Sequence, residues 1–356
     1  MTTRILYRLP DAAAVAEDGK LTEYLPADRQ EAGAVFLGKA ERMMPGLDCA
    51  FVDIGRKKAG FLPLKENSRT FTGGDFRSGD LIPVQIRKEE TGEKGAFLSR
   101  DISLAGTYVI LMPMNRFTGV SKRIEDEDVR HRMKETGRQI AGERFGIVMR
   151  EASANAEEET IRQEAETLYA EWTGLQKRIE EGGKPGLILG QDPMDELIRD
   201  YSGKGPYTVE TAKQLPEALQ GQLKTALGRI ITIKGGGNLV IDRCEAMTVI
   251  DVNTGSSRPG PDKRQTVLNT NLEACEAIAG ILRLRNTGGM ILIDFIDMAE
   301  EKDRSLVEER LKEAVRKDRE KTVIHGWTRL GLMEMTRKRQ RQELTAETTK
   351  EGVQPI

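Results

Sequence analysis

The chain has 356 residues, of which 31% are charged and 38% hydrophobic, so it is long enough for two or more domains and has the composition of an ordinary soluble globular protein. No run of 18 apolar residues occurs and the first residues lack the core of a signal peptide, so we expect no membrane-spanning segment and a cytoplasmic location. Three widely separated cysteines and two histidines exclude a zinc ribbon, a disulfide framework and a histidine-rich zinc site, which leaves carboxylate and metal chemistry as the simplest choice for catalysis.

Charge is unevenly distributed along the chain, although the formal net charge is only −2. Residues 151–181 carry nine acidic and three basic side chains, whereas residues 302–341 carry thirteen basic and seven acidic ones. The basic segment suits a polyanionic substrate. The alternative, a helix face that is charged only because it is solvated, stays open.

The first 33 residues have the pattern of short strands between polar turns, and they are too few to enclose a core, so they must pack on a later part of the chain. From Val35 to Ser103, short strands separated by Gly, Pro and Asp turns follow one another closely, which is typical of a small closed barrel of the oligonucleotide-binding type. The expected strands are Val35–Ala40, Asp48–Asp53, Ala59–Leu64, Leu81–Arg87 and Ala96–Arg100.

Alternation within these strands places two rings on the outer surface of the barrel. Phe51 lies between the apolar residues of one face, and Phe61 points away from the two leucines that follow it. Exposed rings near lysines such as Lys39 and Lys94 are suited to base stacking and phosphate attraction. The alternative, that both rings belong to the core, stays open because phenylalanine is more often buried.

Beyond the barrel, residues 108–113 and 145–150 have the pattern of strands, and residues 156–181 form an acidic amphipathic helix that serves packing rather than chemistry. Its apolar stripe consists of Ile161, Ala165, Leu168, Trp172, Leu175 and Ile179.

From residue 187 the pattern becomes α/β, and three consecutive strands are expected at residues 229–234, 238–243 and 247–252. Gly235–Gly237 predicts a hairpin turn, because neither a Gly-Lys-Ser/Thr ending nor a helix follows it. A charged amphipathic helix is expected at residues 305–321, and the last dozen polar residues are expected to be mobile.

Two aspartates, Asp251 and Asp294, each follow an apolar strand-like run, and one helix-sized segment separates the two runs. Thr270 and Glu273 match a capping box at the start of that helix. A strand–helix–strand unit usually crosses over between parallel neighbours, which would bring both carboxylates to one edge of the sheet and favours a shared hard metal ion. Either aspartate alone is equally well explained as a loop cap, but the pair with Asn253, able to hydrogen-bond a ligand carboxylate, favours the metal site.

These residues belong to long, ordered motifs that closely resemble the catalytic core of the ribonuclease E/G endoribonucleases. The resemblance covers nearly the whole chain and rests on residues 244–253, 269–274, 282–285, 288–298 and 331–337, together with 51–53, 60–64 and 102–106 in the barrel region.

The resemblance implies an α+β multidomain fold. A divided RNase H-like subdomain would contain an inserted S1-type OB barrel and a 5′-sensor segment, and a DNase I-like α/β catalytic subdomain would follow. The implied bounds are 1–33 and 187–225 for the two RNase H-like parts, 34–103 for the barrel, 104–186 for the 5′-sensor region, 226–342 for the catalytic subdomain and 343–356 for a flexible tail.

The resemblance also implies the roles of individual residues. Asp251 and Asp294 match the aspartates that bind a catalytic Mg²⁺, for which Mn²⁺ can substitute, and Asn253 matches the asparagine that orients one of them. The RNA-binding positions of the family map onto Phe51, Phe61 and Lys94, whereas Asp297 matches no ligand. Lys39 is an RNA-binding candidate because it lies near the expected rings.

Two departures from the family pattern limit what is transferred. Arg150, Lys122 and Arg123 are candidates for a 5′-monophosphate sensor, but Glu151 stands where the family usually has threonine, and a carboxylate opposes a phosphate there. The Cys-Pro-x-Cys zinc link is also absent from the sequence, so no zinc and no zinc-linked oligomer are expected, and the chain is expected to be a monomer or a weak homodimer.

The function expected from the sequence is therefore Mg²⁺-dependent endonucleolytic hydrolysis of single-stranded RNA in RNA decay or rRNA processing, leaving 5′-phosphate and 3′-hydroxyl ends. Two alternatives remain. One is a catalytically weak RNA-binding scaffold of the same family, and the other is a metal nuclease that acts on DNA or on an RNA:DNA hybrid.

Overall fold

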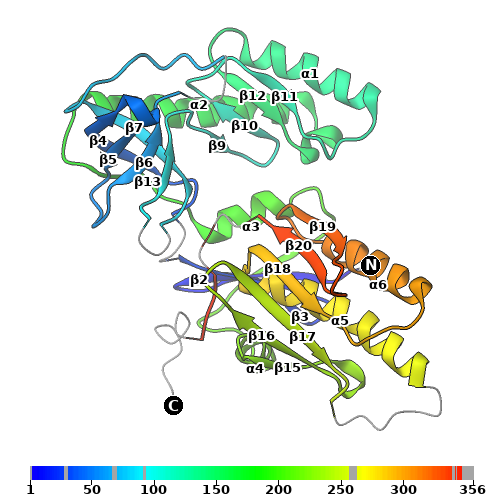
Figure 1. Cartoon of the computed structure of the whole chain (residues 1–356). Coiled ribbons are helices and arrows are strands. Elements are labelled where there is room, and N and C mark those ends of the chain that lie inside the picture. Colours follow the sequence, from blue (N-terminus) through cyan, green and yellow to red (C-terminus); the bar gives the residue numbers. More distant parts are fainter. Residues whose placement is uncertain are drawn as a thin grey trace. The chain divides into compact units, whose positions relative to one another are not determined.

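The computed structural model describes residues 2–27, 31–65, 70–90, 94–255, 263–338, 341 and 343–346. The chain divides into two compact units, one formed by Met1–Leu25 with Val209–Ile356 and the other by Pro26–Thr208 (Figure 1). No helix among the described residues is long and apolar enough to cross a membrane. Of the last dozen residues, which the sequence predicts to be mobile, all those after residue 346 lie outside the described ranges.

Residues 35–99 of the second unit form a closed barrel, as the sequence predicts. The neighbouring strands are β4, β5, β6, β8 and β7 in that order, and pairing of β7 with β4 closes the barrel. Alternation explains the closure, because the side chains that point inward, among them Val52, Leu62 and Leu98, are completely buried. The strands span Val35–Met44 (β4), Cys49–Asp53 (β5), Gly60–Pro63 (β6), Leu81–Lys88 (β7) and Phe97–Ser99 (β8).

A second part of this unit is a four-stranded sheet with the order β11-β12-β10-β9 and two helices that pack on it, α1 and α2. The predicted apolar stripe of the acidic helix is confirmed, since it packs into one core with Val109, Leu111 and Ile147 of the sheet. The elements are β9 Leu104–Ala105, β10 Val109–Met112, β11 Thr118–Val120, α1 Glu127–Ala141, β12 Gly146–Met149 and α2 Glu158–Glu180, followed by β13 Gly186–Leu189 and α3 Pro193–Tyr201.

In the first unit, the N-terminal strands pack on a later segment, as the sequence predicts. The sheet order is β14-β1-β2-β3, and the helix α4 contributes Leu219 and Leu223 to a core that also contains Tyr7 and Leu21. These elements are β1 Arg4–Arg8, β2 Ala12–Glu17, β3 Lys20–Pro26, β14 Thr208–Thr211 and α4 Glu217–Ala226.

A six-stranded sheet forms the larger part of the first unit, with the order β15-β16-β17-β18-β20-β19 and with α5 and α6 packed on one face (Figure 1). Only β17 and β18 pair in parallel, and α5 connects them, which confirms the predicted crossover. The elements are β15 Ile230–Thr232, β16 Asn238–Arg243, β17 Met247–Asn253, α5 Lys263–Arg285, β18 Gly289–Asp294, α6 Glu301–Val315, β19 Thr322–Trp327 and β20 Met333–Arg337.

Two local predictions for the helices that pack on this sheet are wrong. Helix α5 is already formed at Lys263, so Thr270 and Glu273 are not a capping box, and the Thr270 hydroxyl donates instead to the carbonyl of Thr266 within the helix. Helix α6 begins and ends a few residues earlier than expected, because Glu301 and Asp303 favour a helix N-terminus.

Candidate functional site

Strand register places the two predicted carboxylates side by side. Asp251 on β17 and Asp294 on β18 are direct partners in the parallel ladder, and both side chains are exposed. Neighbouring strands lie about 4.8 Å apart, so two carboxylates in register are within reach of one cation. Their neighbours in sequence, Ile250 and Ile293, are completely buried on the other face, which fixes both aspartates on the open face.

Asn253 occupies the same face of β17 two residues after Asp251. Its side-chain amide donates a hydrogen bond to Asp251 Oδ2 at 2.7 Å, which holds the carboxylate in one orientation and leaves its other oxygen free of this contact. The structure therefore brings together all three residues that the sequence singles out for catalysis.

The surroundings of Asp294 raise the pKa of its carboxyl group. Partial burial raises the pKa of its carboxyl group, and the negative charges of Asp251 and Asp297 raise the pKa further. A divalent cation between the aspartates would relieve this repulsion. Two carboxylates are enough for Mg²⁺, which keeps several of its waters and also binds substrate phosphate, although the described residues contain no group of three or more His, Cys, Asp or Glu side chains arranged for a metal.

The segment after β18 is fixed by Asn271 of α5, a residue that the sequence analysis does not single out. Asn271 is completely buried, and its amide donates to the carbonyl of Ile296 at 2.8 Å while its oxygen accepts from the Ile296 N–H at 3.1 Å. A buried asparagine with both groups paired to one backbone unit determines the path of that backbone. Two features mark it in the sequence: it lies within residues 269–274 of the family resemblance, and it is a polar residue on the buried face of an amphipathic helix.

On the barrel, the predicted rings lie on one outer row. Phe51 pairs in register with Phe61, which pairs with Phe97, and the ring centroids are 6.3 Å and 5.6 Å apart in turn. Phe51 and Phe61 are half-buried and outside the barrel core, and Lys39 and Lys94 are both exposed.

Three further residues of this row are missed by the sequence analysis. Phe97 is 37% exposed and stacks on Phe61. Arg42 is in register with Phe51 at one end of the row, and Lys88 is in register with Phe97 at the other, with its ammonium 5.9 Å from the ring centroid. Alternation within residues 96–100 would have placed Phe97 outward with the other rings, and a row of rings between two cations suits single-stranded nucleic acid.

The candidate 5′-sensor residues divide into two groups. Arg150 binds Asp200 at 2.9 Å and also donates to the carbonyl of Gly106. Arg123 lies 3.5 Å from Glu151, which also accepts a 2.9 Å hydrogen bond from the hydroxyl of Ser121, and Lys122 is exposed. Glu151 thus contacts both a cationic side chain and a hydroxyl among the candidate 5′-sensor residues and their neighbours.

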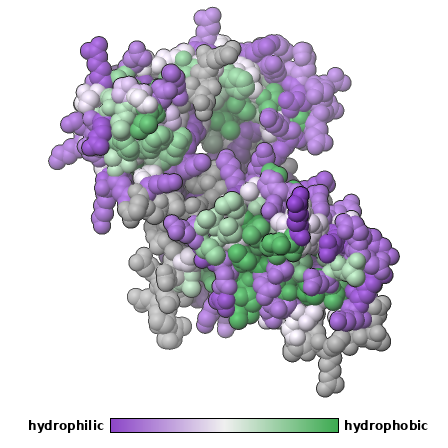
Figure 2. All heavy atoms as spheres, viewed as in Figure 1, coloured by the Kyte–Doolittle hydropathy of each residue, from purple (hydrophilic) through white to green (hydrophobic). Residues whose placement is uncertain are grey.

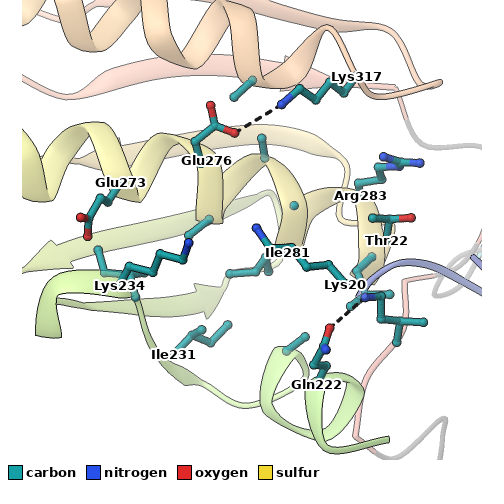
Figure 3. Close-up of a pocket in the computed structure, with 18 of the residues that line it drawn as sticks. Lys20, Thr22, Gln222, Ile231, Lys234, Glu273, Glu276, Ile281, Arg283 and Lys317 are labelled. Atoms are coloured by element: carbon teal, nitrogen blue, oxygen red, sulfur yellow. Dashed lines mark hydrogen bonds and ion pairs between the residues drawn. The ribbon is translucent and has the colours of Figure 1, made fainter. Parts of the chain in front are cut away.

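The first unit also contains a cavity of about 910 Å³ that is separate from the aspartates (Figure 3). Its walls carry both charges, including Lys20, Lys234 and Glu273, and Glu276 pairs with Lys317 across 3.7 Å. None of the catalytic residues predicted from the sequence lines this cavity. Asp251 and Asp294 are therefore exposed on the open face of the sheet and lie outside this cavity.

Comparison with known proteins agrees with this geometry. The model of the Ribonuclease E/G family matches residues 103–218 and 208–340. Ribonuclease G of Haemophilus influenzae is 36% identical over 93% of this chain and 78% of its own length, and Ribonuclease G of Escherichia coli is 34% identical over 97% and 81%. Ribonuclease E of Escherichia coli is 36% identical over 88% of this chain, which spans only 34% of that relative's length.

Proposed function

The chain belongs to the ribonuclease E/G family, and from this premise we propose that it is an endoribonuclease that cleaves single-stranded RNA in RNA decay or rRNA processing. The observation that carries the proposal is the register of Asp251 with Asp294 on adjacent parallel strands, with Asn253 bound to the first carboxylate. Two carboxylates at one strand edge are what a metal-assisted phosphodiesterase requires.

Asp251 and Asp294 would hold Mg²⁺, or Mn²⁺ in its place, and the bound ion would polarise the scissile phosphate and lower the pKa of an attacking water. Asn253 keeps the Asp251 carboxylate aimed at the site through its 2.7 Å hydrogen bond. The water oxygen would bond to phosphorus as the bond from phosphorus to O3′ breaks, and the O3′ would leave as a hydroxyl after taking a proton. The products would be a 5′-phosphate and a 3′-hydroxyl.

The barrel would bind the RNA strand through the row of Phe51, Phe61 and Phe97, whose ends carry Arg42 and Lys88. Stacking on a ring tolerates any base, so binding would show weak sequence preference, and contacts of the lysines and arginine with phosphates would make it sensitive to salt.

A cleavage assay tests the proposal against its two alternatives. Labelled single-stranded RNA, DNA of the same sequence and an RNA:DNA hybrid are each incubated with Mg²⁺ or with EDTA. We expect cleavage of the RNA alone, its loss in EDTA, and its loss in Asp294→Asn. Binding of RNA without any cleavage would favour the scaffold, and faster cleavage of DNA or hybrid would favour the other nuclease.

A further inference from the structure

The face of the six-stranded sheet that carries the aspartates also exposes apolar side chains. Its opposite face is the one covered by α5 and α6, and there Ile250, Ile293 and Met333 are completely buried. On the open face, Ile230 is 59% exposed and Met290 is 50% exposed. Figure 2, seen from the same side as Figure 1, shows apolar residues gathered in the middle of this unit, where Figure 1 draws β16, β17 and β18.

Register shows how these side chains surround the carboxylates. Ile230 pairs with Val240, which pairs with Asp251, so an aliphatic pair continues the row that contains both aspartates. One row further from the strand ends, Val249 pairs with Leu292. Rows on one face are about 7 Å apart, so Val249 and Leu292 adjoin the carboxylates directly.

Besides the two aspartates, this face carries charged groups on the strands that flank β17 and β18. Asp242, the partner of Val249 on β16, is held by both ends of the Arg229 guanidinium at 2.6 Å, and Glu334 is the partner of Leu292 on β20. Between them, Val249 and Leu292 offer a half-buried aliphatic surface without a charge or a hydrogen-bonding side chain. Such a surface attracts an apolar ring face and offers nothing to a phosphate.

We propose that Val249 and Leu292 form a subsite for a nucleobase of the RNA strand next to the scissile phosphate, an inference that rests on the proposed function. A phosphodiester bound at Asp251 and Asp294 must approach from the open face, because α5 and α6 block the other one. The flanking nucleoside then lies within one row of the carboxylates. A base that has lost its stacking neighbours in an extended strand gains by lying on apolar side chains.

This subsite would position the RNA strand rather than select its base sequence. Aliphatic side chains cannot form hydrogen bonds with the edges of a base, so the subsite would accept all four bases. It would not bind an abasic nucleotide, which has no ring to place on the side chains. The base would act as an anchor that keeps the scissile phosphate over the aspartates, and its removal would lower the cleavage rate even where the barrel still binds the strand.

The test combines a change in the substrate with a change in the protein. Cleavage is measured on RNA that is intact or that lacks one base on either side of the scissile phosphate, with the unaltered chain, Leu292→Thr and the control Val323→Thr. Val323 is also aliphatic and exposed on this face, but it lies on the edge strand β19. Threonine suits a strand, and thermal unfolding checks that each variant is folded.

We expect removal of the base on one side to slow the unaltered chain and Val323→Thr by roughly fivefold to tenfold, the scale of one lost apolar contact. Leu292→Thr should be slowed to a similar degree on intact RNA and little further on the abasic RNA, because both changes remove the same contact. Equal cleavage rates of the unaltered chain on intact and abasic RNA would overturn the subsite, and this comparison needs no variant. The subsite would also be overturned if the loss of rate from Leu292→Thr and the loss of rate from the missing base multiplied independently.

Other outcomes separate this inference from the proposed function. If the unaltered chain fails to cleave intact RNA, the proposed function and the subsite fall together. If intact RNA is cleaved but neither abasic substrate is slowed, only the subsite is wrong. Leu292→Thr could instead change the molecular mass measured by sedimentation and leave the loss of rate on abasic RNA unchanged. That result would assign the face to contact between two copies of the chain.

Discussion

Single side chains in this protein are placed by strand register and by buried pairing. Asp294 is in register with Asp251 because an alternating pattern puts Ile293 and Ile250 inside, and the sequence is sufficient to predict that. Asn271 is different. Its two hydrogen bonds to Ile296 join residues 25 apart in the chain, and nothing local marks that pairing. Polar contacts between residues that are distant in the chain could not be predicted from the sequence.

The buried ion pair of Asp318 with Arg337 is predicted to contribute strongly to stability. Arg337 binds both carboxylate oxygens, at 2.7 Å and 3.2 Å, and the two side chains are only 6% and 2% exposed. Asp318→Ala would leave a buried guanidinium without its counter-charge, so we expect the free energy of unfolding to fall by about 3 kcal/mol in denaturant titration. Asp242→Ala, which breaks an exposed pair with Arg229, should change it little. Equal losses in both variants would contradict the argument.

The cysteines are predicted to differ in reactivity. Burial raises the pKa of the Cys275 thiol to about 12, whereas Cys244 is exposed. The thiolate is the reactive form, so Cys275 stays protonated and inert as the pH rises from about 7 to 9, whereas the exposed Cys244 is accessible to an alkylating reagent. Mass mapping after alkylation of the folded protein should find Cys244 modified, and Cys275 only after denaturation. Modification of Cys275 in the folded protein would show that its burial is transient.

Recognition of the RNA 5′ end is predicted to be weak in this chain. Glu151 pairs with Arg123 and accepts from Ser121, so a 5′-phosphate would meet a carboxylate. We expect 5′-monophosphate and 5′-hydroxyl RNA to be cleaved at similar rates, and Glu151→Thr to introduce a preference for the monophosphate. The matched control Glu135→Thr, on α1, also frees an arginine from an exposed pair. A large monophosphate preference in the unaltered chain would refute this prediction.

Strands and helices were more predictable than their ends. The barrel strands, the acidic helix and the parallel pair β17 and β18 follow from periodicity. The start of α5 was missed because Thr270 and Glu273 imitate a cap, whereas Val267 and Leu268 before them pack on the core and keep that segment helical. Packing of a helix on a sheet thus overrides a local capping signal.

The row of rings on the barrel is predicted to act as a unit in RNA binding. Phe97→Ala would remove the most exposed ring and the stacking partner of Phe61. We expect the dissociation constant for single-stranded RNA to rise by about tenfold, because a base stacked on a ring contributes roughly 1–3 kcal/mol. The control is Phe117→Ala, which removes an exposed ring outside the barrel. An equal loss in both variants, measured by fluorescence anisotropy at fixed salt, would contradict a specific role of the row.

The organisation of the whole chain depends on distant segments. Strand β14 pairs with β1 in the N-terminal sheet. The residues of the second unit lie between these two strands in the sequence. Composition and periodicity contain no signal for that pairing, because the two strands are about 200 residues apart. The first 33 residues are too few to enclose a core, and this alone predicts that they pack on a later segment. Only the resemblance to a family indicated which later residues these are.

The most direct test of the account is the Mg²⁺ dependence of cleavage of one labelled single-stranded RNA by the unaltered chain and by Asp294→Asn. Because Asp251 and Asp294 are register partners on adjacent strands, loss of one carboxylate should remove the ion. We predict endonucleolytic cleavage in Mg²⁺, none in EDTA, and a loss of at least about a hundredfold in Asp294→Asn while RNA binding is retained. Cleavage at an unchanged rate in EDTA or in Asp294→Asn would contradict it.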